Sequence, residues 1–115
     1  MVHHMNLKPQ PFELIADGYK TIELRLLDEK RQKIAVGDTL VFTNTAALEQ
    51  QLRCSVKKLY CFADFAALYA ALPLDKCGYL PHELATARPE DMDLYYPPEK
   101  QRQYGVVGIE IEKIG

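Results

Sequence analysis

Apolar and polar residues alternate along several short stretches of the chain, which is the pattern of half-buried β-strands. In one such stretch, Ile22, Leu24 and Leu26 share one face. Glu23 and Arg25 share the opposite face. We expect strands over residues 4–7, 20–27, 39–43, 51–60 and 106–114, with residues 46–50 connecting the third strand to the fourth.

A helical repeat replaces this alternation elsewhere. Phe65, Leu68 and Tyr69 fall on one stripe of a helix, which predicts that they face the core. Asp64 is a suitable N-cap for this helix, and Gly18 is a suitable left-handed end for an earlier one. Helices are expected over residues 11–17 and 64–72, a loop over residues 74–80, and two short helical pieces over residues 81–87 and 89–95.

Strands and helices do not alternate regularly along the chain, which disfavours a doubly wound parallel sheet. About five strands with non-local connections and helices at their ends predict an α+β fold instead. The sheet is expected to be a small, partly closed β-barrel or a strongly curved sheet. The chain has 115 residues, close to the commonest domain size, so we expect a single domain over residues 1–115.

Composition narrows the classes of function. The formal net charge is −2, whereas a domain that grips long nucleic acid without specificity carries a basic surplus. A nucleotide-sized ligand needs only a few well-placed charges and fits this composition. No apolar run approaches the roughly 20 residues that span a bilayer. The first residues also lack the basic and then apolar pattern of a signal peptide.

The cysteines and histidines carry little chemistry. Cys54, Cys61 and Cys77 are odd in number and no pair has C-x-x-C spacing, which predicts reduced thiols in a cytoplasmic protein. Cys77 has no obvious histidine partner and is expected to be a small packing residue. His82 and the two adjacent histidines near the start have no partner at ligand spacing, so no metal site and no cofactor are expected.

The segment GYKTIELR, residues 18–25, has the form G-x-K-x-x-E-x-R and is the strongest candidate for a functional site. Gly18 permits a sharp reversal of the backbone, and Lys20 follows at the turn, where a flexible ammonium group can reach over the mouth of a cleft. Glu23 and Arg25 are two positions apart on a strand, so they point the same way. Three ionisable groups this close perturb one another's pKa values, as clusters at functional sites do.

This pattern resembles the ASCH family (activating signal cointegrator homology), a branch of the PUA-like superfamily. VGDTL at 36–40 is similar to the family's G-D turn and second barrel strand. FADF at 62–65, followed by Leu68, is similar to its central helix, and YGVVGIE at 104–110 is similar to its closing strand. The resemblance covers nearly the whole chain. It implies a PUA-like small mixed β-barrel of about five or six strands flanked by short helices, with a cleft beside the motif.

The resemblance implies that the cleft binds RNA or a nucleotide-like ligand. Some bacterial members hydrolyse N4-acylated cytidines and others have been described as ribonucleases, so a hydrolase of a modified nucleoside or of RNA is the alternative. The amidohydrolase branch uses a lysine, a threonine hydroxyl and a glutamate from the helical region. Lys20 matches the lysine, and Glu23 stands where the threonine would be. Asp75 and Glu83 are the nearest candidates for the glutamate.

The motif admits a binding role, an enzymatic role and a purely structural one. In the binding role, Lys20 and Arg25 contact a phosphate or a base edge, and Glu23 orients Arg25 or accepts a hydrogen bond from an amine. In the enzymatic role, Lys20 moves a proton or stabilises charge and Glu23 is the general base, although two nearby cations weaken a base. In the structural role, the three charges form an ordinary ion-pair network.

Two further features bear on function. Tyr79 lies in a glycine-containing loop and is the candidate for stacking on a base. The segment YYPP at 95–98 predicts an exposed patch of aromatic and proline side chains, which suits a protein partner and gives a third class of function.

Overall fold

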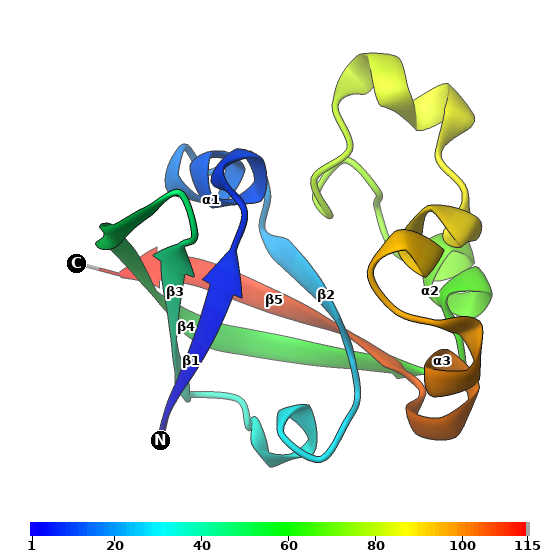
Figure 1. Ribbon diagram of the computed structural model, residues 1–115, viewed down its shortest axis with the longest axis horizontal. Helices are drawn as coiled ribbons and strands as arrows, with labels where there is room; N and C mark the ends of the chain where they lie inside the picture. The colour runs from blue at the N-terminus through cyan, green and yellow to red at the C-terminus, as the bar shows by residue number, and fades with distance from the viewer. Residues whose placement is uncertain (115) are drawn as a thin grey trace.

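A computed structural model describes residues 1–114, and a five-stranded mixed sheet forms its frame (Figure 1). The strand order is β1-β3-β4-β5-β2, with β1 parallel to β3 and the other neighbouring pairs antiparallel. The predicted α+β class is confirmed. The strands are β1 (Val2–Leu7), β2 (Ile22–Leu26), β3 (Thr39–Asn44), β4 (Ala47–Phe62) and β5 (Val106–Ile114).

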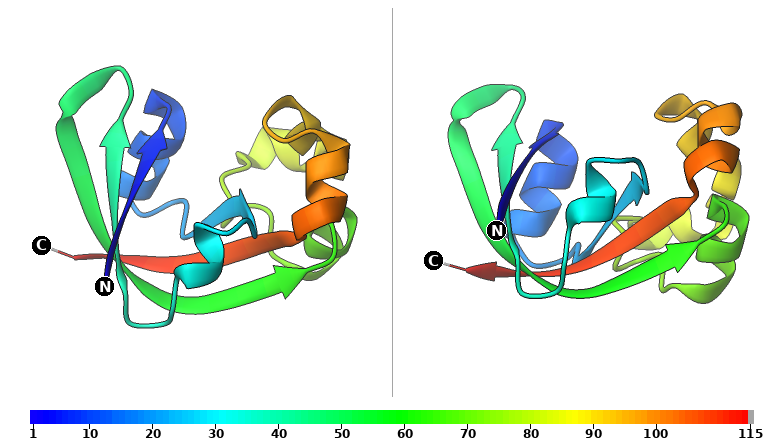
Figure 2. Two further views of the ribbon diagram at one scale, coloured as in Figure 1. Left: turned by 60° about the horizontal axis from the view of Figure 1, so that its bottom comes forward. Right: turned by 90° about the horizontal axis from the view of Figure 1, so that it is seen from below.

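The sheet curls into a half-barrel, as the sequence predicts. Figure 2 shows β4 and β5 extending together across the molecule, with β1 and β3 rising at one end. The register of β4 shifts against β5 between Val56 and Lys58, and such a bulge bends a strand. In the described part of the chain, β1 and β2 are the two edges of the sheet and do not pair with each other.

The helices lie at two places on this frame. Helix α1 (Pro9–Ala16) follows β1 and lies beside the end of the sheet formed by β1 and β3 (Figure 1). The other α-helices and the later 3-10 helices gather at the far end of β4 and β5. They are α2 (Phe65–Ala71), η2 (Pro81–Thr86), η3 (Pro89–Leu94) and α3 (Pro98–Tyr104), while η1 (Arg31–Lys33) lies in the connection from β2 to β3.

Two apolar cores hold these parts together. Leu40, Phe42 and Ile109 are fully buried inside the curl of the sheet, where Phe12 of α1 packs with them. A second core joins the sheet to the helical end of the molecule. Its buried members are Ile22, Leu24, Leu26, Phe65, Leu68, Tyr69, Cys77 and Val106. The three apolar residues of β2 therefore face one core together, as their alternation predicts. Because side chains alternate along a strand, Glu23 and Arg25 point to the opposite face of β2.

One local prediction is wrong, and one helix has no counterpart among the predictions. The connection expected over residues 46–50 is much shorter, because β4 begins at Ala47. The Asn44 side chain accepts a hydrogen bond from the Ala46 amide at 2.9 Å, which closes a tight turn. No predicted element covers residues 98–104, where the structure has α3. Only Gln101 of this helix is buried, so no apolar periodicity marks it.

Gly105 is a position where glycine is required. It has φ 74° and ψ −173°, a region that residues with a side chain rarely adopt. A Cβ atom there would lie 2.9 Å from the carbonyl oxygen of Phe62. Gly37 also has positive φ, at 95°, but a Cβ atom there would meet nothing within 4 Å.

We expect Gly105→Ala to lower the free energy of unfolding by about 1–3 kcal/mol, and to lower it more than Gly37→Ala does. Both variants carry backbone strain, so the difference between them isolates the clash with Phe62. Urea unfolding of the two variants and the wild type measures the effect. Equal losses in the two variants would show that the close approach of Phe62 to Gly105 is unimportant.

Candidate functional site

Lys20, Glu23 and Arg25 meet at a buried carboxylate. Glu23 is only 4 % exposed. One of its carboxylate oxygens lies 2.7 Å from Nζ of Lys20. The other accepts from Nε of Arg25 at 2.8 Å and lies 2.8 Å from Nη2 of the same guanidinium. The structure thus brings together all three charged residues of the motif.

Burial and charge act against each other at this carboxylate. Burial favours the neutral acid, but the positive charges and hydrogen bonds of Lys20 and Arg25 outweigh it, so the pKa of Glu23 lies below its ordinary value of 4.5. Burial likewise opposes the charge of Arg25, and the Glu23 carboxylate overcomes it and raises the guanidinium pKa. Glu23 is therefore ionised at neutral pH and is a weak base.

The turn after α1 and the backbone of Gly78 hold Lys20 in position. Gly18 ends the reversal after α1 with φ 87°, as predicted, and the Lys20 amide donates to the Leu14 carbonyl at 2.9 Å. A Cβ atom on Gly78 would lie 3.1 Å from Cδ of Lys20, so the lysine stem runs along the backbone of that glycine. Its small size leaves room for the stem on its way to Glu23.

Arg25 connects the two edges of the open sheet. It lies on β2, and its Nη2 donates to the main-chain carbonyl of Asn6 in β1 at 2.9 Å. The same guanidinium holds Glu23, so one side chain ties the motif strand to the first strand across the opening of the half-barrel. Asn6 has no part in the sequence prediction, because a main-chain carbonyl leaves no signal in a motif.

A cleft of about 810 Å³ opens beside the cluster. The candidate ligand-binding residues predicted from the sequence all line this cleft: Lys20, Glu23, Arg25 and Tyr79. Other lining residues come from the end of β1 and the start of α1, and from the segment around η2 and η3. They include Asn6, Lys8, Pro11, Leu14, Tyr69, Glu83, Asp91, Leu94, Tyr95 and Tyr96.

Tyr79 is held in place by polar contacts at both ends. Its hydroxyl lies 2.7 Å from the Tyr69 hydroxyl and donates to Asp91 at 2.8 Å. Its carbonyl accepts from the hydroxyl of Tyr19 at 2.6 Å. Burial, together with the neighbouring phenol and carboxylate, raises the pKa of Tyr79 far above its ordinary value. The ring is thus a fixed, neutral part of the cleft wall.

Tyr95 and Tyr96 lie in the same cleft but differ in exposure. Tyr95 is 58 % exposed, and Nζ of Lys8 lies 5.7 Å from the centre of its ring. Tyr96 is half-buried and stacks on Phe65 with a centroid distance of 6.2 Å. The patch predicted over residues 95–98 is therefore only partly exposed, because one of its two aromatic rings packs against the second core.

Of the two acidic candidates for the helical glutamate, Glu83 lines the cleft. One of its carboxylate oxygens accepts from the Leu80 amide at 2.8 Å. Asp75 is exposed and is not among the lining residues. Cys77 is buried beside Lys20, and burial raises the pKa of its thiol to about 11, which fits the predicted packing role.

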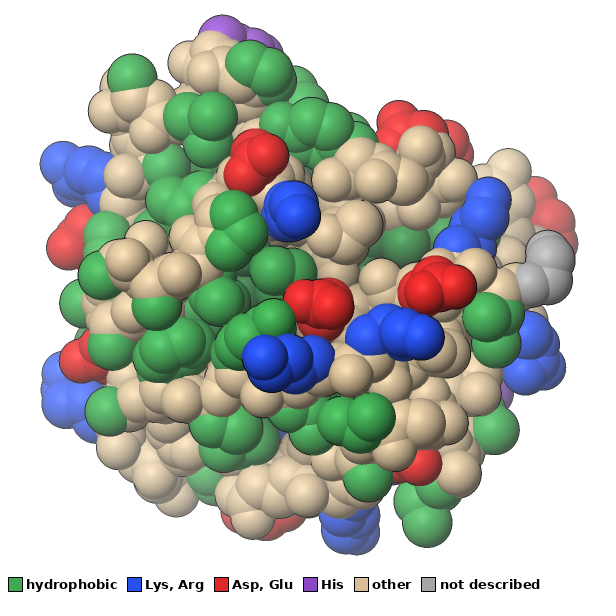
Figure 3. All heavy atoms as spheres, turned by 180° about the vertical axis from the view of Figure 1, so that it is seen from behind, with side chains coloured by type: hydrophobic (Ala, Val, Ile, Leu, Met, Phe, Trp, Pro, Cys, Tyr) green, Lys and Arg blue, Asp and Glu red, His purple; other side chains and the backbone are tan. Residues whose placement is uncertain are grey.

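The structure also bears on metal sites and on membrane-spanning helices. Among residues 1–114, no group of three His, Cys, Asp or Glu side chains is placed to hold a metal ion. No helix in that range is both long and apolar enough to cross a membrane. Figure 3 shows basic and acidic side chains interspersed on the back of the molecule, with hydrophobic side chains gathered over the helical end.

Comparisons with known proteins give one family and several similar solved structures. The ASCH domain matches residues 5–115. The crystal structure of the hypothetical protein PH0355 is similar at 32 % identity and a TM-score of 0.81, over 99 % of this chain and 100 % of that one. The solution structure of PF0455 from Pyrococcus furiosus is similar at 31 % identity and a TM-score of 0.69, over 99 % and 98 %.

A crystal structure of a ZmASCH mutant from Zymomonas mobilis shares the fold at 12 % identity and a TM-score of 0.65, over 97 % of this chain and 72 % of that one. No curated protein matches the chain significantly. These comparisons establish family and fold, whereas the functions of the motif side chains must be argued from their geometry.

We expect Glu23→Gln to lower the free energy of unfolding by about 3–5 kcal/mol at neutral pH, because it leaves two largely buried cations without their carboxylate. The folded pKa of Glu23 is below 4.5. The wild type therefore gains stability from this group above about pH 4.5 and loses it as the pH falls through the folded pKa. The variant lacks this pH dependence.

Denaturant unfolding at several pH values measures both effects. Glu112→Gln is the matched control, because Glu112 is 65 % exposed and forms its ion pair with Lys57 at 3.5 Å on the surface. An exposed pair of this kind contributes about 0–1 kcal/mol. A loss for Glu23→Gln as small as that of the control would mean that the cluster is an ordinary surface network.

Proposed function

Because the chain belongs to the ASCH domain family, we propose that it binds RNA or a nucleotide-like ligand in the cleft beside Lys20, Glu23 and Arg25. One observation carries the proposal: a preassembled, ionised cluster lines a cleft that also contains tyrosine rings. Cations recognise phosphates and base edges, and aromatic rings stack on bases. An ordinary surface ion-pair network would not require a cleft beside it.

The size and charge of the site favour a nucleotide-sized ligand over a long strand. The cleft volume of about 810 Å³ falls within the roughly 300–1,000 Å³ typical of small-molecule sites. The net charge of −2 and the interspersed surface charges give little long-range attraction for a polyanion. An RNA strand would therefore place a single nucleotide in this cleft, and the rest of the strand would contact the protein surface weakly.

Each member of the cluster has a distinct role in this proposal. Lys20 and Arg25 provide positive charge to the ligand, and the bonds of Arg25 to Glu23 and Asn6 through Nε and Nη2 fix its position. Glu23 orients both cations before the ligand arrives, which lowers the entropy lost on binding. The fixed ring of Tyr79 and the exposed ring of Tyr95 are the stacking surfaces.

A hydrolase is the second candidate, and the position of Glu83 favours it. Glu83 lines the same cleft as Lys20, so a carboxylate and an ammonium group border one ligand space. Glu23 is poorly suited to be the base because its pKa is lowered. In this version Glu83 activates water, Lys20 stabilises the developing negative charge, and the substrate is a modified nucleoside or RNA.

We expect a nucleoside, nucleotide or short RNA to raise the melting temperature of the wild type and to raise that of Lys20→Ala and Arg25→Ala much less. A ligand at a hundred times its Kd stabilises a protein by about 2.7 kcal/mol, which is several degrees for a domain of this size. Each variant is compared with its own ligand-free melting temperature, because loss of either cation also affects stability. Lys57→Ala removes an exposed cation outside the cleft and is the control.

The same mixtures are analysed for product by chromatography. Product that disappears in Glu83→Gln supports the hydrolase, whereas a thermal shift without product supports the binding domain. If no ligand shifts the wild type, or if the cleft variants shift as much as Lys57→Ala, the proposed ligand site is wrong.

A further inference from the structure

Two tyrosine hydroxyls and a carboxylate form a hydrogen-bonded row in the cleft. The Tyr69 hydroxyl lies 2.7 Å from the Tyr79 hydroxyl, which donates to one carboxylate oxygen of Asp91 at 2.8 Å. That oxygen also accepts from the Arg88 amide at 3.1 Å, at the start of η3. Tyr69, Tyr79 and Asp91, which we call the tyrosine network, all line the cleft.

The protons of the tyrosine network have only one possible order. The hydrogen bonds from the Arg88 amide and the Tyr79 hydroxyl hold the pKa of Asp91 below its ordinary value of 3.8, so this carboxylate is ionised and can only accept. A hydroxyl group has one proton, and that of Tyr79 is directed at Asp91. Tyr79 has only lone pairs left for its other neighbour, so Tyr69 has to be the donor between the two hydroxyls.

This order leaves the Tyr69 oxygen with only lone pairs for a ligand. Its proton is directed at Tyr79, and among residues 1–114 no third group hydrogen-bonds to this oxygen. The ring of Tyr69 packs edge to face with Phe65 in the second core, while 9 % of the residue is exposed. Because the ring is packed in the core, the hydroxyl is the end of the side chain that meets the cleft.

The surroundings of the Tyr69 phenol agree with this placement. Burial raises the pKa of Tyr69 to about 12, and Asp91, Cys77 and Tyr95 act in the same direction. These three residues all line the cleft, so the phenol lies among cleft-lining groups. With so high a pKa, Tyr69 keeps its proton at neutral pH, and the order of the tyrosine network is preserved.

The cleft therefore offers both an acceptor and donors to one ligand. Tyr69 is the acceptor, and Lys20 supplies donors, because its ammonium group has three protons and Glu23 takes one contact. Cytosine and adenine carry an amino group beside a ring nitrogen, which is the complementary pair of a donor and an acceptor. Uracil and hypoxanthine carry a carbonyl in place of the amine, so two oxygens would face each other without a proton between them. Their ring N–H does not replace the amine, because the carbonyl oxygen lies beside it.

We propose that the tyrosine network selects a ligand with a hydrogen-bond donor at Tyr69, namely an amino base, cytosine or adenine, in preference to uracil or hypoxanthine. This inference rests on the proposed function and adds the type of base to it. Tyr69 contacts the ligand. Tyr79 and Asp91 are positioning residues, because they set the direction of the Tyr69 proton.

The experiment compares cytidine with uridine and adenosine with inosine by titration calorimetry, each as the nucleoside, its 5′-monophosphate and a short homopolymeric RNA. In the wild type we expect the amino member of every pair that binds to bind about tenfold more tightly or better. Tyr79→Phe keeps the ring but removes the acceptor of the Tyr69 proton. Tyr69 can then donate to the ligand, and the keto member gains about tenfold in affinity.

Tyr69→Phe removes the acceptor itself, so the amino member loses about tenfold and the keto member changes little. The preference thus disappears in both variants, but through opposite members of each pair, which a general loosening of the cleft would not produce. Tyr19→Phe is the matched control. It removes a hydroxyl that donates to the Tyr79 carbonyl at 2.6 Å, outside the tyrosine network, and we expect it to keep the preference.

The inference is overturned if Tyr79→Phe retains the preference of the wild type, or if Tyr19→Phe abolishes it as completely as Tyr79→Phe does. Equal affinity for the amino and keto members in the wild type also overturns it, but leaves the proposed function standing. If no nucleoside, monophosphate or RNA binds, the proposed function is wrong and this inference is wrong with it.

Discussion

A buried carboxylate needs cations, and Glu23 takes both of its cations from its own motif. Lys20 and Arg25 approach the two oxygens at 2.7 and 2.8 Å, and both side chains are themselves mostly buried. Removing Glu23 would leave two cations without their carboxylate, and removing either cation would leave one carboxylate oxygen without its partner in a poorly hydrated place. The fold must therefore hold the turn after α1, the strand β2 and the loop around Gly78 in one arrangement.

Arg25 extends this constraint from the motif to the whole sheet. The half-barrel is open between β1 and β2, and the guanidinium bridges these edges by its bond to the Asn6 carbonyl. The apolar face of β2 packs on the second core, so the polar face has to line the opening. The hydrogen bond from Arg25 to the Asn6 carbonyl thus joins the two open edges and also forms one side of the cleft. Stability and the proposed ligand binding thus depend on the same arginine.

Much of this arrangement could be predicted from the sequence because it is local. The alternation of Ile22, Leu24 and Leu26 places Glu23 on the other face, and the spacing of Glu23 and Arg25 makes them neighbours. Tyr79 lines the cleft, and only its position in a glycine-containing loop marks it in the sequence. The ASCH pattern accounts for the curled mixed sheet, since the order of its motifs covers nearly the whole chain.

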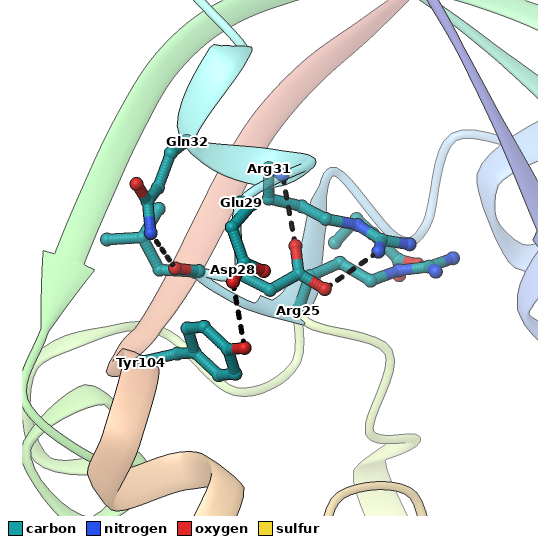
Figure 4. A network of polar contacts seen from close by, with 8 residues as sticks. Arg25, Asp28, Glu29, Arg31, Gln32 and Tyr104 are labelled. Atoms are coloured by element: carbon teal, nitrogen blue, oxygen red, sulfur yellow. Dashed lines mark hydrogen bonds and ion pairs between the residues drawn. The ribbon is translucent and has the colours of Figure 1, made fainter.

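The remaining parts of the site depend on contacts that no sequence pattern records. Asn6 contributes a main-chain atom, and Tyr96 reaches the cleft only because the second core packs η3 against α2. Arg31 lies in a charged connection that is indistinguishable from a solvated loop in the sequence, whereas the structure pairs its side chain with Asp28 (Figure 4). Helix α3 and the tight turn at Asn44 are set by side-chain hydrogen bonds, which leave no periodicity in the sequence.

The most direct test of this account is the pKa of Glu23 in the ligand-free protein, measured by following its side-chain carboxyl carbon by NMR as the pH is lowered. If Lys20 and Arg25 hold the buried carboxylate in its ionised form, its midpoint lies below the ordinary value of 4.5. Loss of Arg25 then moves it upward. A midpoint at or above 4.5 would mean that burial outweighs the cations, and the ionised, preassembled cleft wall on which the proposed function depends would not exist.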